Sequence, residues 1–304
     1  MKFFDLQVNG YAGADFCSAN LTLEQCRRAC DELAADGVAG ILATVITNTI
    51  EALCAKLRKL AAFREQDEMI RRMIAGFHIE GPFLNAAAGY IGAHPPGCVK
   101  PANIDDMQRL LDASSQLTRI VTLAPENDPG LKTTAWLASQ GITVSAGHCD
   151  PSLDQLRAAI DAGLSMFTHL GNGCPLELPR HDNIIQRALA LSDRLWICYI
   201  PDDVHVPFHA LKNYLAVSGL ERSIMVTDAI SAAKLGAGLH ELSGAPVKVD
   251  EQGIARRPGS MNLAGSTITM PNIRANLTRH LGLSEIEIER LVVSNPRKAV
   301  GLNH

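Results

Sequence analysis

The feature that most constrains this chain is a repeated alternation of short apolar runs with segments of helical periodicity. Most of the runs are continuously apolar rather than alternating, which is typical of parallel strands covered on both faces. Helical segments separate them along the first three quarters of the chain. Eight strands are therefore expected, at residues 3–9, 38–47, 73–80, 119–123, 142–146, 165–169, 195–200 and 223–227.

This order of elements predicts an α/β fold, a (β/α)8 TIM barrel followed by two additional C-terminal helices near residues 272–281 and 284–293. A doubly wound open sheet is the alternative. The 304 residues, of which 47% are hydrophobic, suffice for one barrel of this kind. Because no linker rich in Pro, Gly or Ser divides the chain, residues 1–304 are expected to form a single domain.

Charge, cysteine usage and the N-terminal sequence exclude several classes of protein. The net charge of -4 comes without a dense Lys and Arg cluster, so no nucleic-acid partner is expected. The eight cysteines form no CxxC pair, which indicates reduced thiols and a cytoplasmic protein. No apolar leader and no apolar run of about eighteen residues occurs, so neither secretion nor a membrane partner is expected.

Polar residues follow almost every one of the apolar runs. In a barrel of parallel strands, the active site lies where the strands end and the following loops begin. Polar side chains seldom end so many apolar runs for packing alone. The residues at these ends are Gln7, Asn9, His78, Glu80, His148, His169, Asp202, Asp203, His205 and Asp228.

Glu80 is the residue in this set that most needs a partner. A carboxylate at the end of a buried strand is costly unless a positive group neutralises it, and for Glu80 alone an ion pair and a metal ion are both open. An isolated histidine is more often a core residue bonded to the backbone. Glu80 with His148 and His169, which lie one βα unit apart, instead gives the ligand set of a catalytic divalent metal with one open position. Zinc is the first choice, with iron, manganese, cobalt and nickel as alternatives.

Such a metal activates water and polarises a carbonyl group, so the ligand set predicts a hydrolase. Hydrolysis of an amide also needs a group that carries a proton from the water to the departing amine. Asp228 lies just after the apolar run 224–226 and is the candidate, with a helix cap or turn as the other interpretation. Asp202 and Asp203 are weaker candidates because Pro-Asp-Asp is an ordinary turn composition.

Short motifs that are weak individually occur in one order along nearly the whole chain. They are GFHIEGPF (76–83), GAH (92–94), VTLAPE (121–126), SAGH (145–148), THL (168–170), DVHV (203–206), VTDA (226–229) and LAGSTITM (263–270). In this order the chain resembles the N-acetylglucosamine-6-phosphate deacetylase family of the amidohydrolase superfamily. The resemblance implies that one metal ion is bound by Glu80, His148 and His169.

The same resemblance assigns further roles. Asp228 is implied to be the general base and acid, and His94 is implied to polarise the acetamido carbonyl. His205 is implied to contact the substrate and Met270 to line the acyl pocket. His78 receives no ligand role and is expected to support or pack beside Glu80.

Differences from the family pattern sharpen these expectations. Many amidohydrolases carry His-x-His on the first strand, where this chain has Gln7 and Asn9. Neutral amides are poor ligands for a transition metal, so one strongly bound ion per chain is expected, with both amides near the substrate. Asn172 and the backbone of Gly173 are implied to hold a sugar phosphate.

Arg180 is the candidate for the phosphate-binding arginine, which in the family reaches the site of a neighbouring subunit, so a homodimer is expected. The β-sandwich that normally flanks the family's barrel is expected to be absent. The implied reaction is hydrolysis of N-acetylglucosamine 6-phosphate, a small phosphorylated amino sugar, to glucosamine 6-phosphate and acetate. Alternatives are a deacylase of another N-acyl sugar or small amide without phosphate, and a non-catalytic barrel that binds sugar phosphates.

Overall fold

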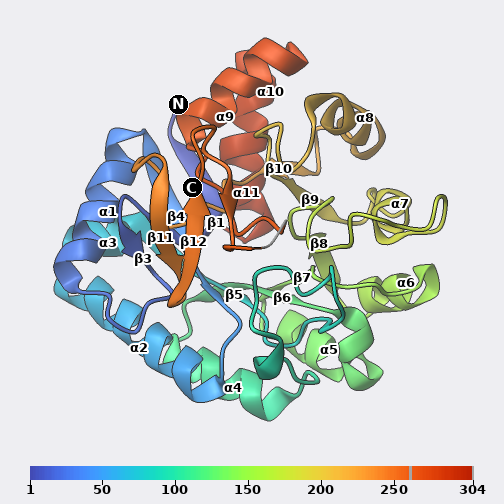
Figure 1. The fold of residues 1–304 in the computed structure, drawn as a ribbon. Helices are drawn as coiled ribbons and strands as arrows, with labels where there is room; N and C mark the ends of the chain where they lie inside the picture. Colours follow the sequence, from blue (N-terminus) through green and yellow to red (C-terminus); the bar gives the residue numbers. More distant parts are fainter. Residues whose placement is uncertain (260–261, 303–304) are drawn as a thin grey trace.

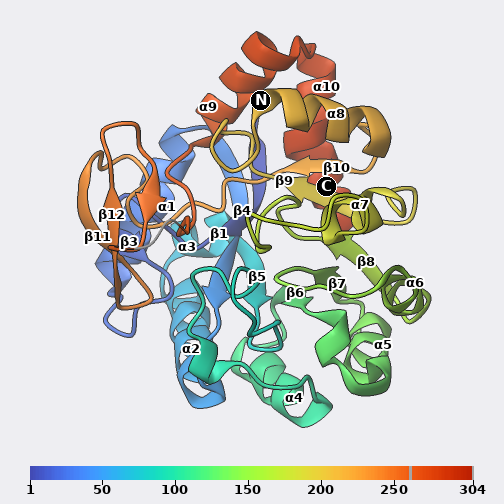
Figure 2. The same cartoon turned by 45° about the vertical axis from the view of Figure 1, so that its right-hand side comes forward.

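The computed structural model describes residues 1–259 and 262–302, and its centre is a sheet of eight parallel strands ringed by helices (Figures 1 and 2). Neighbours in the sheet follow one another in the chain. This order confirms the predicted barrel and excludes the doubly wound open sheet, in which the strand order reverses. The strands are β1 (Phe3–Val8), β4 (Val38–Ile46), β5 (Ile74–Glu80), β6 (Thr118–Leu123), β7 (Thr143–Ala146), β8 (Leu164–Phe167), β9 (Trp196–Tyr199) and β10 (Ser223–Met225).

Helices cover the outside of the sheet and bury their apolar faces against it. The first begins at a capping box, in which the Thr22 side chain accepts from the Gln25 backbone amide and the Gln25 side chain accepts from the Thr22 backbone amide. The helices are α1 (Leu23–Ala35), α2 (Ile50–Gln66), α3 (Glu68–Met73), α4 (Ile104–Ala113), α5 (Lys132–Ser139), α6 (Leu153–Asp161), α7 (Ile184–Leu189), α8 (Phe208–Ser218), α9 (Met270–Asn276), α10 (Glu285–Glu289) and α11 (Asn295–Ala299). Two π-helical segments, Leu277–Leu281 and Arg290–Ser294, continue α9 and α10.

The barrel closes at a seam between β1 and β10 that is not a regular ladder. Val8 and Ala229 form an isolated parallel bridge, and the backbone amide of Asn9 donates to the Ala229 carbonyl at 2.7 Å. Below this bridge the buried Asp5 carboxylate accepts from the Thr227 hydroxyl at 2.6 Å. Side-chain and irregular backbone bonds therefore join the first and last strands.

A small three-stranded sheet lies beside the barrel mouth and was not predicted. Its strands are β11 (Gly238–Leu242), β12 (Ala245–Val249) and β13 (Ala255–Arg256), drawn in orange in Figure 1. Leu242, Val247 and Val249 turn inward and form a second apolar cluster that includes Ile46. The insertion between β10 and α9 thus builds one wall beside the strand ends.

No helix within the described ranges is long and apolar enough to cross a membrane. All eight cysteines lie within the described ranges, and no disulfide joins any of them there.

Candidate metal centre and active site

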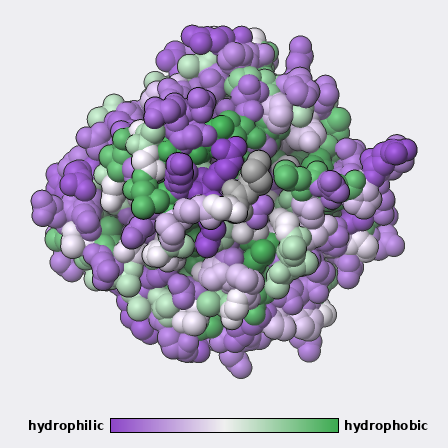
Figure 3. Space-filling view, viewed as in Figure 1, coloured by the Kyte–Doolittle hydropathy of each residue, from purple (hydrophilic) through white to green (hydrophobic). Residues whose placement is uncertain are grey.

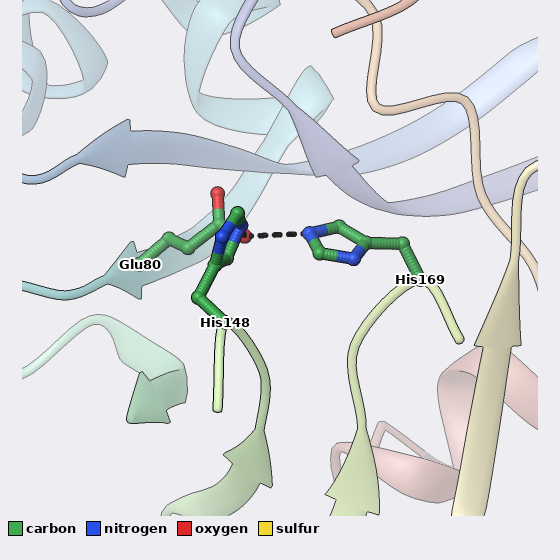
Figure 4. A group of neighbouring side chains, drawn as sticks. All are labelled: Glu80, His148 and His169. Atoms are coloured by element: carbon green, nitrogen blue, oxygen red, sulfur yellow. Dashed lines mark hydrogen bonds and ion pairs between the residues drawn. The ribbon is translucent and has the colours of Figure 1, made fainter. Parts of the chain in front are cut away.

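Glu80, His148 and His169 come together at the ends of three strands of the barrel. Glu80 is the last residue of β5, His148 follows β7 and His169 follows β8. All three side chains are buried and point toward one another (Figure 4), and one ligand atom from each lies within 4.8 Å of the others. The structure thus brings the three predicted ligands into one cluster that could hold a metal ion.

The backbone at three of these strand ends has the left-handed conformation, which affects the direction of the side chains. His148, His169 and Asp228 have positive φ angles of 51°, 34° and 50°. Left-handed backbone is uncommon for residues other than glycine and is frequent at functional sites. Each polar side chain consequently leaves its strand toward the barrel axis and not toward the outer helices.

The hydrogen bonds of His148 test whether this cluster fits a cation. Its Nδ1 lies 2.7 Å from the Tyr90 carbonyl oxygen, which can only accept, so Nδ1 carries the proton. In the neutral ring Nε2 therefore presents a lone pair, and it lies 3.4 Å from Glu80 Oε1. A lone pair facing a carboxylate is satisfied by a cation between them, and a backbone carbonyl behind the ring is the usual support of a metal-binding histidine.

Glu80 and His169 form the other half of the cluster. His169 Nε2 lies 3.0 Å from Glu80 Oε1, and His169 Nδ1 is buried without a partner among the described residues. Burial alone would lower the pKa of His169, but the hydrogen bond and charge of Glu80 raise it. Burial would raise the pKa of Glu80, whereas the hydrogen bond and charge of His169 hold it well below its usual value. The carboxylate thus stays ionised, and its negative charge favours a cation at this point.

Gln7 supports the carboxylate from within the barrel. Its Nε2 donates to Glu80 Oε1 at 3.2 Å, and Gln7 is not among the residues that line the cavity above the cluster. The structure therefore places Gln7 behind Glu80 and away from the substrate contact that was predicted for it.

His94 reaches the cluster from the loop after β5. Its Nε2 lies 3.8 Å from Glu80 Oε2, and its ring meets that of His148 edge-on with centroids 4.4 Å apart. His94 Nδ1 is 2.9 Å from the hydroxyl of Thr47. Burial lowers the pKa of His94 to about 3, so its imidazole is neutral.

Asp228 faces the cluster from the end of β10. Its Oδ1 accepts from Asn9 Nδ2 at 2.6 Å, which fixes the carboxylate beside the barrel axis. Burial, and then repulsion by Glu80, raises the pKa of Asp228 to about 6. A carboxylate whose pKa lies near neutrality can both take up and release a proton under ordinary conditions.

A cavity of about 210 Å³ opens above these groups. Figure 3 shows this face with a mostly hydrophilic periphery and hydrophobic residues nearer its centre. The predicted site residues on its wall are Asn9, Glu80, His94, His148, His169, Asn172, Gly173, His205 and Asp228. Most of the predicted site therefore shares one cavity.

Two of these wall residues come from the loops after β8 and β9. His205 Nδ1 lies 2.6 Å from Asp202 Oδ2, so Asp202 fixes the orientation of that ring. The Asn172 side chain donates to the His169 carbonyl at 3.2 Å, which ties the loop back to the metal-binding histidine. Asp202, a weak candidate for the proton carrier, thus contacts His205 and supports the orientation of its ring.

Met270 and Arg180 lie outside this cavity. Met270 is the first residue of α9 and is buried in the main apolar core, because the start of that helix packs against the barrel. Met270 is therefore not part of the cavity wall, where its predicted role in the acyl pocket would place it. Arg180 is exposed on the segment 175–182, which leads away from its own barrel mouth toward α7 (Figure 2).

Other residues of the cavity wall were not predicted as site residues. The apolar part of the cavity wall comes from Ile46, Leu176, Val204, Leu242 and Leu263. Leu242 belongs to the unpredicted β11–β12 hairpin, and a hairpin signal did exist there. Ser243 and Gly244 both have positive φ, 54° and 81°, and Ser-Gly between alternating apolar residues is typical of a two-residue hairpin turn.

Known proteins with the same architecture identify the family. No family model matches the chain. An N-acetylgalactosamine-6-phosphate deacetylase of Shewanella sp. (strain ANA-3) is 35% identical over 286 residues, 93% of this chain and 69% of the relative. The chain belongs to the N-acetylglucosamine-6-phosphate deacetylase family. The resemblance found in its motifs is thereby confirmed.

Two further members extend the comparison. The N-acetylglucosamine-6-phosphate deacetylase of Bos taurus is 30% identical over 311 residues, which cover 99% of this chain and 74% of that protein. The crystal structure of the Mycobacterium smegmatis member superimposes with a TM-score of 0.89 at 31% identity, covering 99% of this chain and 78% of the other. The family's barrel is thus shared along almost the whole chain.

Proposed function

We propose that this protein is a metal-dependent amidohydrolase that removes the acetyl group from N-acetylglucosamine 6-phosphate, giving glucosamine 6-phosphate and acetate. The observation that carries the proposal is the buried cluster of Glu80, His148 and His169 facing Asp228 across one cavity. A Mycobacterium smegmatis relative, in a mutant form, has been solved in complex with N-acetyl-D-glucosamine-6-phosphate.

Glu80, His148 and His169 would hold one divalent ion, with zinc as the first choice. When bound, such an ion polarises the amide carbonyl and makes water more acidic. Gln7 and Asn9 already donate to Glu80 and Asp228, and neutral amides are poor ligands, which supports one ion per chain. Elemental analysis that found two tightly held ions per chain would contradict this.

The proton work is assigned to Asp228. As a base it takes a proton from the attacking water, and as an acid it passes that proton to the departing nitrogen. The bond from Asn9 holds one carboxylate oxygen, so the other is free to face the reacting atoms. His94 and His205 lie on the cavity wall, where their rings can hold the acetamido group and the sugar hydroxyls.

The phosphate needs a positive charge that this cavity does not itself supply. Among the described residues of its wall there is no Lys or Arg. Asn172 and the Gly173 backbone can donate to phosphate oxygens, and we assign the charge to Arg180 of a second copy in a homodimer. This assignment rests on the exposed position of Arg180 and on the resemblance to the family.

The test is release of acetate and of a free amine from N-acetylglucosamine 6-phosphate by the metal-loaded protein. Because the 35% identical relative is named for the galactosamine counterpart, the assay includes the 4-epimer, N-acetylgalactosamine 6-phosphate. Unphosphorylated N-acetylglucosamine tests whether phosphate is required. No hydrolysis of any of the three with the metal site filled would overturn the proposal.

A further inference from the structure

Glu126 ends the motif VTLAPE (121–126), yet the mechanism above gives it no task. It lies in the short 3-10 helix Pro125–Asn127, directly after β6. In the barrel β6 stands between β5, which ends in Glu80, and β7, which precedes His148. The strand between two ligand-bearing strands thus ends in a carboxylate that does not reach the metal cluster.

The contacts of Glu126 run to both neighbouring loops. Its Oε1 accepts from Asn85 Nδ2 at 3.0 Å and from the backbone amide of Asp150 at 2.6 Å. The backbone amide of Asn85 in turn donates to the carbonyl oxygen of His148 at 2.9 Å. One carboxylate oxygen therefore links Asn85, in the loop after β5, to the backbone that directly follows His148.

Both linked loops carry groups of the site. The loop after β5 provides the Tyr90 carbonyl that accepts from His148 Nδ1, and four residues later it provides His94. A shift of this loop relative to β7 would move the acceptor behind His148 and the ring beside it. The second oxygen of Glu126 is buried without a partner among the described residues, so the carboxylate is costly to keep.

We propose that Glu126 is a positioning residue, which fixes the loop after β5 against the His148 backbone and so sets the orientation of His148 for metal binding. It acts through Asn85 and Asp150 and does not touch substrate or metal. The inference rests on the metal site of the proposed function, but not on the identity of the substrate.

The test compares Glu126→Ala with Asp128→Ala, a matched control two residues away. Asp128 is buried and accepts from the amides of Thr133 and Thr134 at the start of α5, away from the site. Zinc affinity is measured by competition with a chromophoric chelator, and unfolding by urea is measured in parallel. Glu126→Ala is expected to weaken zinc binding about tenfold, as losses behind metal ligands do, whereas Asp128→Ala only lowers stability.

Glu126→Gln keeps an oxygen that accepts both bonds, so its zinc affinity and its kcat and KM should stay within about threefold of wild type.

If Glu126→Ala does not fold, Asn85→Ala removes one donor and should weaken zinc binding without loss of the barrel. Unchanged zinc affinity in Glu126→Ala and Asn85→Ala, or equal losses in Glu126→Ala and Asp128→Ala, would overturn the inference. Equal losses in Glu126→Gln and Glu126→Ala would show a role for the charge and overturn it too. A wild type that binds zinc without deacetylating would contradict only the proposed function.

Discussion

At the scale of single residues, a substitution at Asp228 should distinguish proton transfer from metal binding. Replacing it by Asn keeps an oxygen that accepts from Asn9 but removes the group that takes up a proton. We expect Asp228→Asn to lower kcat by about 10²–10⁴-fold, the usual contribution of a general acid or base, with KM and metal content nearly unchanged. Steady-state kinetics with elemental analysis of the same preparation measures this. Near-normal turnover with the metal site full would remove Asp228 from the mechanism.

Several of the site residues could be predicted because they end apolar strands. Glu80, His148 and His169 stand where buried strands stop, and barrel geometry alone brings such residues to one face. Met270 shows the limit of this reasoning, because the rotation of α9 decides whether its side chain enters the cavity or the core. Thr47, beside His94, carries no signal because a threonine at the end of a strand is ordinary.

At the scale of elements, the seam between β1 and β10 depends on Asp5. Burial raises the pKa of Asp5 to about 7, although its bonds to Thr227 and Gln7 oppose the shift. Because the folded-state pKa lies above the ordinary value of 3.8, this carboxyl stabilises the fold fully below about pH 4 and loses that contribution as the pH rises through 7.

Asp5→Asn should therefore make the free energy of unfolding less dependent on pH between 4 and 7. An amide at this position can donate to the Thr227 hydroxyl, whose own hydrogen can go to the Gln7 carbonyl at 3.3 Å. Urea unfolding of both proteins at several pH values in this window measures the difference. A wild-type curve no steeper than that of Asp5→Asn would show that Asp5 is not the titrating group.

The β11–β12 hairpin depends on a turn that favours glycine. Gly244 has a φ of 81°, and an added Cβ would meet no atom within 4 Å, so a side chain there is penalised by the backbone alone. Gly244→Ala should cost about 1–2 kcal/mol of hairpin stability. Gly97→Ala is the control, since Gly97 is equally open but does not have such a φ. Hydrogen exchange of the β12 amides measures the loss, and equal exchange in the two variants would contradict it.

Elements that repeat the βα pattern were predictable, and insertions into it were not. The apolar runs predicted all eight barrel strands. The hairpin was missed because β11 and β12 are partly exposed and lie outside the βα repeat, while Leu242 is buried by barrel loops far away in the sequence. For this reason the wall residues that come from inserted segments are less predictable than the residues that end the barrel strands.

At the scale of the whole molecule, the exposed segment 175–182 carries a positive charge that the described wall residues of its own chain's cavity lack. Leu176 is 90% exposed although it borders the cavity, and Arg180 is exposed on the same segment. A symmetric dimer would place the same segment of each copy against the other. Arg180 would then act at a site whose Asp228 belongs to its partner.

Mixing two inactive variants tests this arrangement. Arg180→Ala should lower kcat/KM for N-acetylglucosamine 6-phosphate while keeping its metal, and Asp228→Asn should lower kcat. If Arg180 serves the neighbouring site, a heterodimer of the two variants contains one site with both residues intact. After random exchange of subunits, half of the dimers are mixed and half of their sites are complete, so about a quarter of wild-type activity should return. Activity that stays at the mean of the separate variants, with exchange verified by mass spectrometry, would place the action of Arg180 within its own chain.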